Sequence, residues 1–296
     1  MTLSIHPIDP VSSPFFGGVA SGIDLTQPIT ADQAAEIEKG MDRFGVMVFH
    51  DQRLSDEAQM AFSRHFGELE FASNNLRDTK AQRLGAHIAD ISNLDIDNNV
   101  LARENRRRLF SLGTRLWHSD SSFKVVPAKY SLLSARIIPS KGGNTEFADM
   151  RAAYDTLDDA TRAECEGLVC EHSQLFSRAQ IGFGDFTDDE RREFAPVKQR
   201  LIRRHPSTGW KSLYLASHAG TIVDWPIPEA RAFLRDLIEH ATQRQFVYAH
   251  EWKQFDLVIW DNQATMHRGR PFDAKEVRDM HRTTIAGLRS TLEEAA

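Results

Sequence analysis

The stretch Asp256-Leu-Val-Ile-Trp-Asp-Asn262 is the strongest strand signal in this chain of 296 residues. Its short apolar run is bounded by polar residues, which is typical of a buried strand. Further strands are predicted at residues 46–49, 130–138, 199–204, 212–215, 245–252 and 282–287. Pro206-Ser-Thr-Gly209 predicts a hairpin turn between two of them. Strands outnumber helices and do not alternate with them regularly, so the pattern favours a mainly β barrel or sandwich with flanking helices over a doubly wound α/β sheet.

The helix signals are local and lie around this β core. Thr30 and Gln33 have the spacing of a capping box, and Gly45 suits the end of the helix between them. Ser55 is the expected cap of a second helix that ends at Gly67. Two more helices are predicted at about residues 150–168 and 228–242. We expect these helices to pack outside the sheets.

The composition indicates a globular protein, with 41% hydrophobic residues, 26% charged residues and a formal net charge of −6. This acidic balance argues against general nucleic-acid binding, which needs a basic face. The two cysteines, Cys165 and Cys170, are too few for a disulfide framework or a zinc knuckle, and they fit a reduced cytosolic protein. No apolar run is long enough to span a bilayer, and the first residues lack the pattern of a signal peptide. With no repeat or linker, we expect one cytoplasmic domain over residues 1–296 that binds neither nucleic acid nor membranes.

Residues 72–113 form a polar stretch with few periodic apolar residues. A stretch of this length inside a compact domain is usually a functional loop, and we expect it to be an active-site lid. A group of arginines, with a single acid (Glu104) between them, lies in or just after it: Arg103, Arg106, Arg107, Arg108 and Arg115. We interpret this group first as a solvated charged face, and an anion-attracting mouth is the alternative.

The segment Trp117-His-Ser-Asp-Ser-Ser-Phe123 contains a candidate metal site. Residues two apart in an extended segment point to the same face, so His118 and Asp120 can bind one ion together. An imidazole and a carboxylate are two of the three ligands in the facial triad of non-haem Fe(II) oxygenases. His267, just past the strongest strand, is the best candidate for a third ligand. The pattern alone leaves open a surface His-x-Asp pair and an interior histidine that is only hydrogen-bonded.

Two arginines near the C-terminus can hold carboxylates. Arg278 and Arg282 lie four residues apart, which puts them on one face of a strand, and the planar guanidinium suits a carboxylate. One can hold a dicarboxylate co-substrate and the other an anionic substrate, and two exposed arginines on a barrel wall are the alternative. Upstream, Gly142-Gly-Asn-Thr145 predicts a tight bend followed by a hydroxyl that can assist in holding a carboxylate.

Taken together and in this order, these motifs resemble the taurine/2,4-D dioxygenase family, whose members use Fe(II) and 2-oxoglutarate. The resemblance extends from about Gly22 to Gly287. Within the family, the chain is most similar to the branch that acts on 2,4-dichlorophenoxyacetate. Three segments besides the metal motif carry that similarity: Thr145-Glu-Phe147, Asp149-Met-Arg-Ala-Ala-Tyr-Asp155 and Glu239-His-Ala-Thr-Gln243.

The resemblance implies a double-stranded β-helix, or jelly roll, with flanking helices. It also implies roles for single residues. His118, Asp120 and His267 would bind iron, and Arg278 and Thr145 would hold the far carboxylate of 2-oxoglutarate.

The resemblance also implies a pocket for a small anionic organic acid. Arg282 would bind the acidic group of this substrate. Asn93, His205 and His218 fall in segments that line the pocket in relatives, which makes them further substrate-binding candidates. Members of the family commonly form homo-oligomers, and we expect the same here.

The family chemistry implies a reaction in which O2 and 2-oxoglutarate give succinate and CO2 while the substrate is hydroxylated, with ascorbate as a reductant in vitro. An aryloxyacetate hydroxylated beside its ether oxygen would collapse to a phenol and glyoxylate. The same chemistry on a phenoxypropionate, or on a sulfonate such as taurine, is the alternative. A zinc hydrolase and a barrel that binds an acid without turnover are the remaining interpretations.

Overall fold

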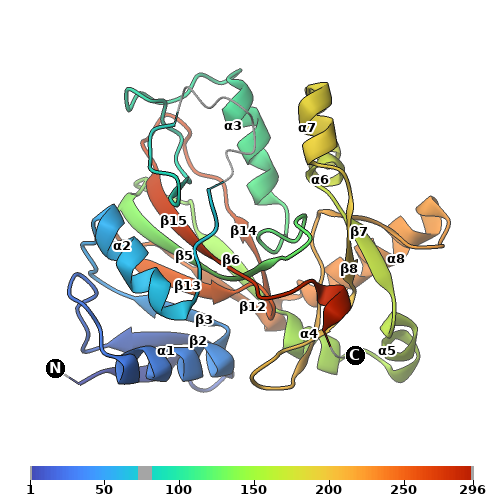
Figure 1. Cartoon of the computed structure of the whole chain (residues 1–296), viewed down its shortest axis with the longest axis horizontal. Helices are drawn as coiled ribbons and strands as arrows, with labels where there is room; N and C mark the ends of the chain where they lie inside the picture. Colours follow the sequence, from blue (N-terminus) through green and yellow to red (C-terminus); the bar gives the residue numbers. More distant parts are fainter. Residues whose placement is uncertain (1, 73–81, 295–296) are drawn as a thin grey trace.

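The computed structural model describes residues 2–72 and 82–294, and its centre is a large β-sheet (Figure 1). The strand order in this sheet is β1-β2-β3-β13-β5-β15-β4. Neighbouring strands are antiparallel except for the parallel pair β2 and β3. The strands are Ser4–Asp9 (β1), Ser13–Ser21 (β2), Val46–Phe49 (β3), Leu257–Asp261 (β13), Ala128–Ile137 (β5), Asp279–Ala286 (β15) and Ala89–Asp90 (β4).

A smaller antiparallel sheet packs against the large one. It consists of β12 (Val247–His250), β6 (Thr145–Asp149) and β14 (Thr265–Gly269) in that order. Phe147 of β6 meets Trp260 of β13 in the core between the sheets, with ring centroids 5.5 Å apart. The two sheets form the jelly roll with flanking helices, so the predicted fold class is confirmed.

Two further sheets extend this framework. One contains β11 (Ala219–Ile222), β7 (Val169–His172) and β8 (Val197–Arg200), and the other is the hairpin of β9 (Ile202–Arg204) and β10 (Lys211–Leu213). The turn of that hairpin is the predicted segment 206–209.

α1 and α2 lie beside the large sheet, whereas α3 and α7 lie at the top of the view, at the opposite end of the molecule from α1 (Figure 1). Apolar side chains of α1 and α2 share a core with the large sheet, and those of α4 and α8 share one with the smaller sheet. The α-helices are Ala31–Phe44 (α1), Asp56–Ser63 (α2), Arg106–Ser111 (α3), Met150–Asp155 (α4), Asp159–Cys165 (α5), Gln174–Gln180 (α6), Asp188–Glu193 (α7) and Ile227–Ala241 (α8). Short 3-10 helices cover Arg64–Phe66, Leu112–Arg115, Arg244–Phe246 and Thr291–Glu293.

Local capping signals set several helix boundaries. Thr30 and Gln33 form both hydrogen bonds of the capping box of α1, and Gly45 ends that helix with φ of 65°. Ser55 caps α2 as predicted. The helix predicted at 150–168 is instead two helices, because the Asp158 carboxylate accepts hydrogen bonds from two backbone N–H groups and starts α5 anew.

The described part of the predicted lid, residues 82–113, is attached to the large sheet by charges. Arg83 pairs with Asp90 of β4, with N and O atoms 2.9 Å apart, and also with Asp279 of β15. Arg107 pairs with Asp90 at 2.7 Å. Residues 73–81 of the predicted lid lie outside the described residues.

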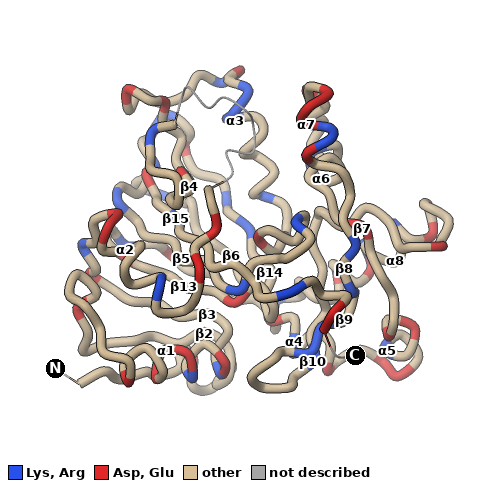
Figure 2. The backbone as a smooth tube through the Cα atoms, viewed as in Figure 1, with Lys and Arg blue, Asp and Glu red and all other residues tan. Residues whose placement is uncertain are grey.

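Two arginines of the group, Arg106 and Arg107, have acidic partners in other elements. The backbone of α3 begins with basic residues, and that of α7 contains both acidic and basic ones (Figure 2). The Arg106 guanidinium pairs with Asp185 at 2.9 Å and with Glu190 of α7 at 2.6 Å. These contacts join α3 to α7. Because Arg106 and Arg107 are both neutralised by carboxylates, they act as structural ion pairs rather than as a free anion-attracting mouth.

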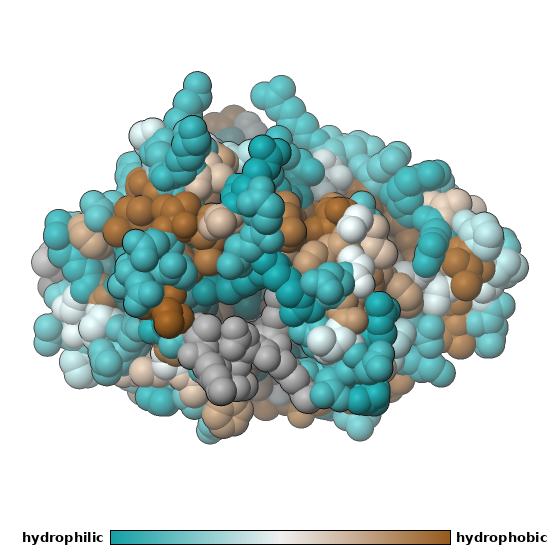
Figure 3. All heavy atoms as spheres, turned by 90° about the horizontal axis from the view of Figure 1, so that it is seen from above, coloured by the Kyte–Doolittle hydropathy of each residue, from teal (hydrophilic) through white to brown (hydrophobic). Residues whose placement is uncertain are grey.

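On the face seen from above, hydrophobic side chains lie in separate areas among hydrophilic ones (Figure 3). In residues 2–72 and 82–294, no helix combines the length and the apolar character needed to cross a bilayer.

His281 of β15 links the large sheet to α2. Its Nδ1 lies 2.5 Å from Asp56 Oδ1, and its Nε2 lies 3.3 Å from Asp279 Oδ1. Burial lowers the pKa of His281, but the hydrogen bonds and charges of Asp279 and Asp56 outweigh that effect, so the net pKa is raised.

Because the pKa of His281 is raised on folding, its stabilisation is complete below the ordinary histidine pKa of about 6.5 and is lost as the pH rises through the folded-state pKa. We therefore expect the difference in unfolding free energy between wild type and His281→Gln to shrink from about pH 6 to pH 8. Urea unfolding at a series of pH values measures this difference, with His65→Gln as an exposed control. A gap that stays constant or widens over this range would contradict the assignment.

Candidate metal centre and substrate pocket

Backbone pairing brings His118 and His267 together. His118 N donates to His267 O at 3.0 Å, and His267 N donates to His118 O at 2.8 Å. The loop that contains His118 thus adds one antiparallel pair to β14, and the two imidazole centroids lie 4.2 Å apart. His267 is the middle residue of β14, the strand that follows β13 along the chain. Its ring packs on that of Trp260, with the ring centroids 4.7 Å apart.

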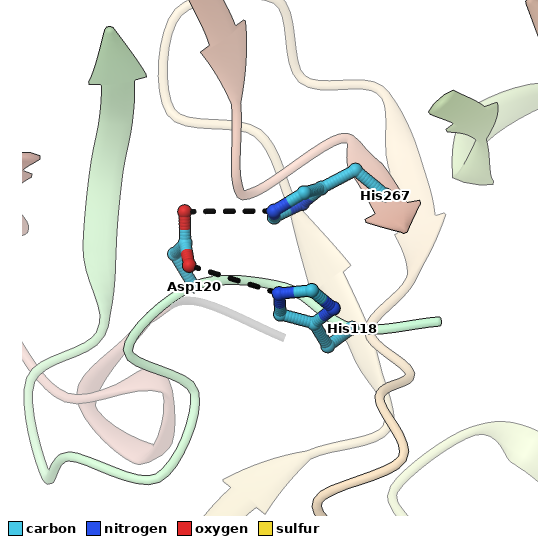
Figure 4. A group of neighbouring side chains, drawn as sticks. All are labelled: His118, Asp120 and His267. Atoms are coloured by element: carbon cyan, nitrogen blue, oxygen red, sulfur yellow. Dashed lines mark ion pairs between the residues drawn. The ribbon is translucent and has the colours of Figure 1, made fainter. Parts of the chain in front are cut away.

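Asp120 completes a cluster of three side chains (Figure 4). Its Oδ1 lies 3.9 Å from His118 Nε2, and its Oδ2 lies 3.7 Å from His267 Nε2. All three residues are buried, and their candidate ligand atoms lie within 4.8 Å of one another. The two members of the His-x-Asp motif face the same point, as expected for an extended segment.

The cluster has the protonation states that a divalent metal ion needs. His118 Nδ1 donates to Leu116 O at 2.8 Å, which leaves the lone pair of Nε2 free. Burial lowers the pKa of His118 and of His267, so both rings are neutral at pH 7. Burial opposes the charge on Asp120, but the nearby Arg282 guanidinium holds the pKa of that carboxyl well below its usual range. Two neutral imidazoles and one carboxylate leave an octahedral ion three positions for other ligands.

Polar residues of the large sheet hold the Asp120 carboxylate in place. Ser131 Oγ of β5 donates to Oδ2 at 2.8 Å, and Arg282 Nη1 of β15 donates to Oδ1 at 2.5 Å. Asn262 accepts the backbone N–H of Asp120 at 3.1 Å and donates to Ser131 Oγ at 3.0 Å. Such outer contacts orient a carboxylate ligand.

Arg278 is a buried guanidinium without an acidic partner among the described residues. Burial lowers the pKa of Arg278 to about 10, so the group keeps its charge at neutral pH. Its Nε lies 3.6 Å from where a Cβ on Gly143 would sit, which places it beside the chain that leads into Thr145. Thr145 Oγ1 accepts from Trp252 Nε1 at 3.0 Å, and its own proton is free to donate. A charged guanidinium and a free hydroxyl proton suit a carboxylate.

Asn93 holds the backbone that carries Arg278. Its Oδ1 accepts the Arg278 N–H at 2.9 Å, and its Nδ2 donates to Glu276 O at 2.8 Å. The pairing of β15 with β5 shifts register between Asp279 and Met280, where β5 has one extra residue, and Arg278 precedes the first residue of β15. The structure therefore places Asn93 behind Arg278, outside the lining of the pocket described next.

A pocket opens beside the metal cluster, and His118, Asp120 and Arg282 contribute to its wall. It encloses about 670 Å³ when the open solvent at its mouth is included. The predicted lid contributes Ala72, His87, Ala89, Ile91 and Gly113 to the wall.

Two histidines that were candidates for this pocket have different positions. His218 lines it, with its ring 6.0 Å from that of His118 and its Nδ1 2.9 Å from Ser177 Oγ. His205 does not line it, because its Nε2 is held 2.8 Å from Asp261 Oδ2.

Arg178 is a pocket residue that sequence reasoning misses. It lies on α6, where no helix was predicted, and it is 5% exposed. It belongs to no spaced motif, so only its burial in the fold distinguishes it from a surface arginine.

A jelly roll with a buried His-Asp-His cluster beside a small-molecule pocket defines a metal-dependent dioxygenase of the type that uses 2-oxoglutarate, also called α-ketoglutarate. The chain belongs to the family described as taurine catabolism dioxygenase TauD, TfdA, whose model matches residues 5–284.

Individual relatives agree with this assignment. The chain is 42% identical to an α-ketoglutarate-dependent 2,4-dichlorophenoxyacetate dioxygenase from Cupriavidus pinatubonensis, over 96% of this chain and 98% of the relative. It is 35% identical to an (S)-phenoxypropionate/α-ketoglutarate dioxygenase from Sphingobium herbicidovorans, over 96% and 94%. The crystal structure of AAD-2 in complex with Mn(II) and N-oxalylglycine superimposes with a TM-score of 0.94 at 53% identity, covering 98% of this chain and all of that one (100%).

Replacing Asp120 by Ala tests the metal centre directly. The change removes one of three ligands and its negative charge, so we expect Mn(II) affinity to fall by on the order of 100-fold or more. Isothermal titration of the metal-free protein measures the affinity, and thermal unfolding checks that the variant is folded. Asp97→Ala, at an exposed carboxylate, is the control. An unchanged Mn(II) affinity would remove Asp120 from the metal site.

Proposed function

We propose that this enzyme hydroxylates an aryloxyacetate such as 2,4-dichlorophenoxyacetate at the carbon beside the ether oxygen, using Fe(II), O2 and 2-oxoglutarate. The observation that carries the proposal is the combination of the buried His118–Asp120–His267 cluster with the buried Arg278 and the partly exposed Arg282. The similarity to 2,4-dichlorophenoxyacetate dioxygenases over nearly the whole chain supports the substrate class.

The two atoms of O2 enter different products in the proposed reaction. One atom of O2 enters the succinate that forms when 2-oxoglutarate loses CO2, and the other enters the substrate as a hydroxyl group. The resulting hemiacetal breaks the bond between its hydroxylated carbon and the ether oxygen. The hydroxyl proton passes to that oxygen, and the products are a phenol and glyoxylate.

Different residues are assigned to iron and to 2-oxoglutarate. His118, Asp120 and His267 would hold iron, which supplies the oxidising chemistry when bound. Thr145 and Arg278 bind the far carboxylate of 2-oxoglutarate through a hydroxyl proton and a guanidinium.

Substrate orientation depends on the pocket wall. Arg282 keeps N–H groups beyond the one that it gives to Asp120, and we assign it to the acidic group of the substrate. His218 lies on the same wall, where its neutral ring can contact bound substrate. Holding the reacting C–H bond at one position is what directs the oxidation.

The same chemistry on a phenoxypropionate is the second candidate, because a relative that is named for that substrate is 35% identical over nearly the full length. A sulfonate such as taurine remains an alternative, since a guanidinium binds either anion. A zinc hydrolase leaves Thr145 without a role, and also the buried Arg278, which has no acidic partner among the described residues. A barrel that binds an acid without turnover leaves the His118–Asp120–His267 cluster without one.

The two cysteines bear on the expected cellular location of the protein. Cys165 and Cys170 are both free and buried, which supports a cytoplasmic location. We retain the predictions that the enzyme forms a homo-oligomer and binds neither nucleic acid nor membranes, and that residues 72–113 act as a lid on a single domain.

Turnover of 2,4-dichlorophenoxyacetate tests the proposed function. With Fe(II), ascorbate, 2-oxoglutarate and O2, we expect 2,4-dichlorophenol and succinate in equal amounts, and neither when iron is left out. Chromatography of both products measures the ratio. Succinate without phenol would reject this substrate, and no succinate with any acid tried would overturn the proposed class of reaction.

Measurements of KM distinguish the role proposed for Arg282 from that proposed for Arg278. Arg282→Ala removes a charge-assisted contact to substrate, so we expect the KM for the aryloxyacetate to rise by about 10- to 100-fold while that for 2-oxoglutarate changes little. Arg278→Ala is the matched variant, for which the opposite pattern is expected. Both assays use saturating Fe(II), because Arg282 also contacts Asp120. A reversed result would mean that the two roles are exchanged.

A further inference from the structure

The pocket contains a buried positive charge that the proposed mechanism does not use. Arg178 of α6 is 5% exposed, and no described carboxylate forms an ion pair with it. Its Nη1 donates to Ser177 Oγ at 3.0 Å, and its Nε has no hydrogen-bond partner. Burial lowers the pKa of Arg178 to about 10, so the group remains charged at neutral pH. A buried charge without a counter-charge is costly unless a ligand provides one.

The surrounding chain is shaped to leave room for this guanidinium. A Cβ on Gly113 would lie 2.5 Å from Arg178 Cζ and 2.6 Å from its Nε, so any side chain at position 113 would displace the group. The ring of Phe110 lies on its other flank, 4.1 Å from Cζ. Phe110 and Gly113 belong to α3 and to the 3-10 helix after it, so this part of the chain contacts the Arg178 side chain directly.

The other charges at the pocket wall are already paired. Glu70 lies 2.6 Å from Lys124, and Asp120 accepts the hydrogen bond of Arg282. Arg178 is therefore the cation of this wall that lacks an anion among the described residues.

We propose that Arg178 binds the acidic group of the organic-acid substrate together with Arg282, which lines the same pocket, and makes the enzyme select anions over neutral aryl ethers. This inference rests on the proposed function and adds a specificity-determining residue to it. Arg282 contacts Asp120 of the metal-binding cluster, and Arg178 supplies the unneutralised charge of the pocket. The guanidinium N–H groups beyond the one that Ser177 accepts can donate charge-assisted hydrogen bonds to a carboxylate.

Arg178→Gln removes the charge and keeps a polar side chain. We expect the KM for 2,4-dichlorophenoxyacetate to rise by about 10- to 100-fold, the KM for 2-oxoglutarate to stay near the wild-type value, and Arg178→Lys to recover part of the loss. The neutral analogue 2-(2,4-dichlorophenoxy)ethanol should be used equally well by both enzymes. Arg235→Gln, on the exposed face of α8, is the matched control.

Binding gives a second readout that needs no turnover. In the protein loaded with Mn(II) and N-oxalylglycine, calorimetry should show weaker binding of 2,4-dichlorophenoxyacetate to Arg178→Gln by the same factor. Gly113→Ala should reproduce much of the loss without changing a charged residue, because its methyl group displaces the guanidinium. Gly184→Ala, where a Cβ would meet nothing within 4 Å, is the control for that variant.

The results separate this inference from the proposed function. If wild-type enzyme releases phenol and Arg178→Gln keeps the wild-type KM and affinity for the acid, the role of Arg178 is overturned and the function stands. A rise in the KM for 2-oxoglutarate alone, or equal losses for the acid and the neutral alcohol, would also overturn it. If wild type releases no phenol and does not bind the acid, the proposed function fails and the inference fails with it.

Discussion

The site depends on keeping one carboxylate charged in a buried position. Asp120 stays ionised because Ser131 donates to its carboxylate and Arg282 adds a second donor and a positive charge, while Asn262 accepts its backbone N–H and donates to Ser131. These supports come from β5, from β15 and from the residue after β13, which are three neighbouring strands of the large sheet. The smaller sheet supplies His267, and its pairing with His118 brings the ligand loop to the same point. The metal centre is therefore a product of two sheets facing each other, and either sheet alone would leave it incomplete.

Much of the fold could be predicted because its signals are local. The cap at Thr30, the stop at Gly45 and the buried runs that became β3 and β13 each depend on a few consecutive residues. The strands β6 and β14 gave no such signal, since they are five residues long and mix polar with apolar side chains. They form strands because they pair with segments that are distant in sequence. A few consecutive residues do not reveal such a pairing.

The candidate site divides in the same way. The His118 and Asp120 pair could be predicted from spacing, and Arg278 from its order after His267. The buried state of Arg278 and the register shift between β15 and β5 could not, because they depend on packing against other strands. Arg178 is the extreme case, since its environment comes from Gly113 and Phe110, far away along the chain. The role proposed for Arg178 depends on the lack of an acidic partner near it among the described residues, and the residues beside it in sequence do not predict this.

The hydrogen bonds of Asn93 join two compartments of the site. Asn93 holds the backbone at Arg278, and Arg278 Nη1 donates to the carbonyl of Ile91, whose residue also lines the pocket. The guanidinium assigned to the co-substrate is thus hydrogen-bonded to the backbone at the edge of the pocket assigned to the substrate. Any change in affinity that one acid causes in the other through this contact is reciprocal, because linkage requires the same free energy in both directions.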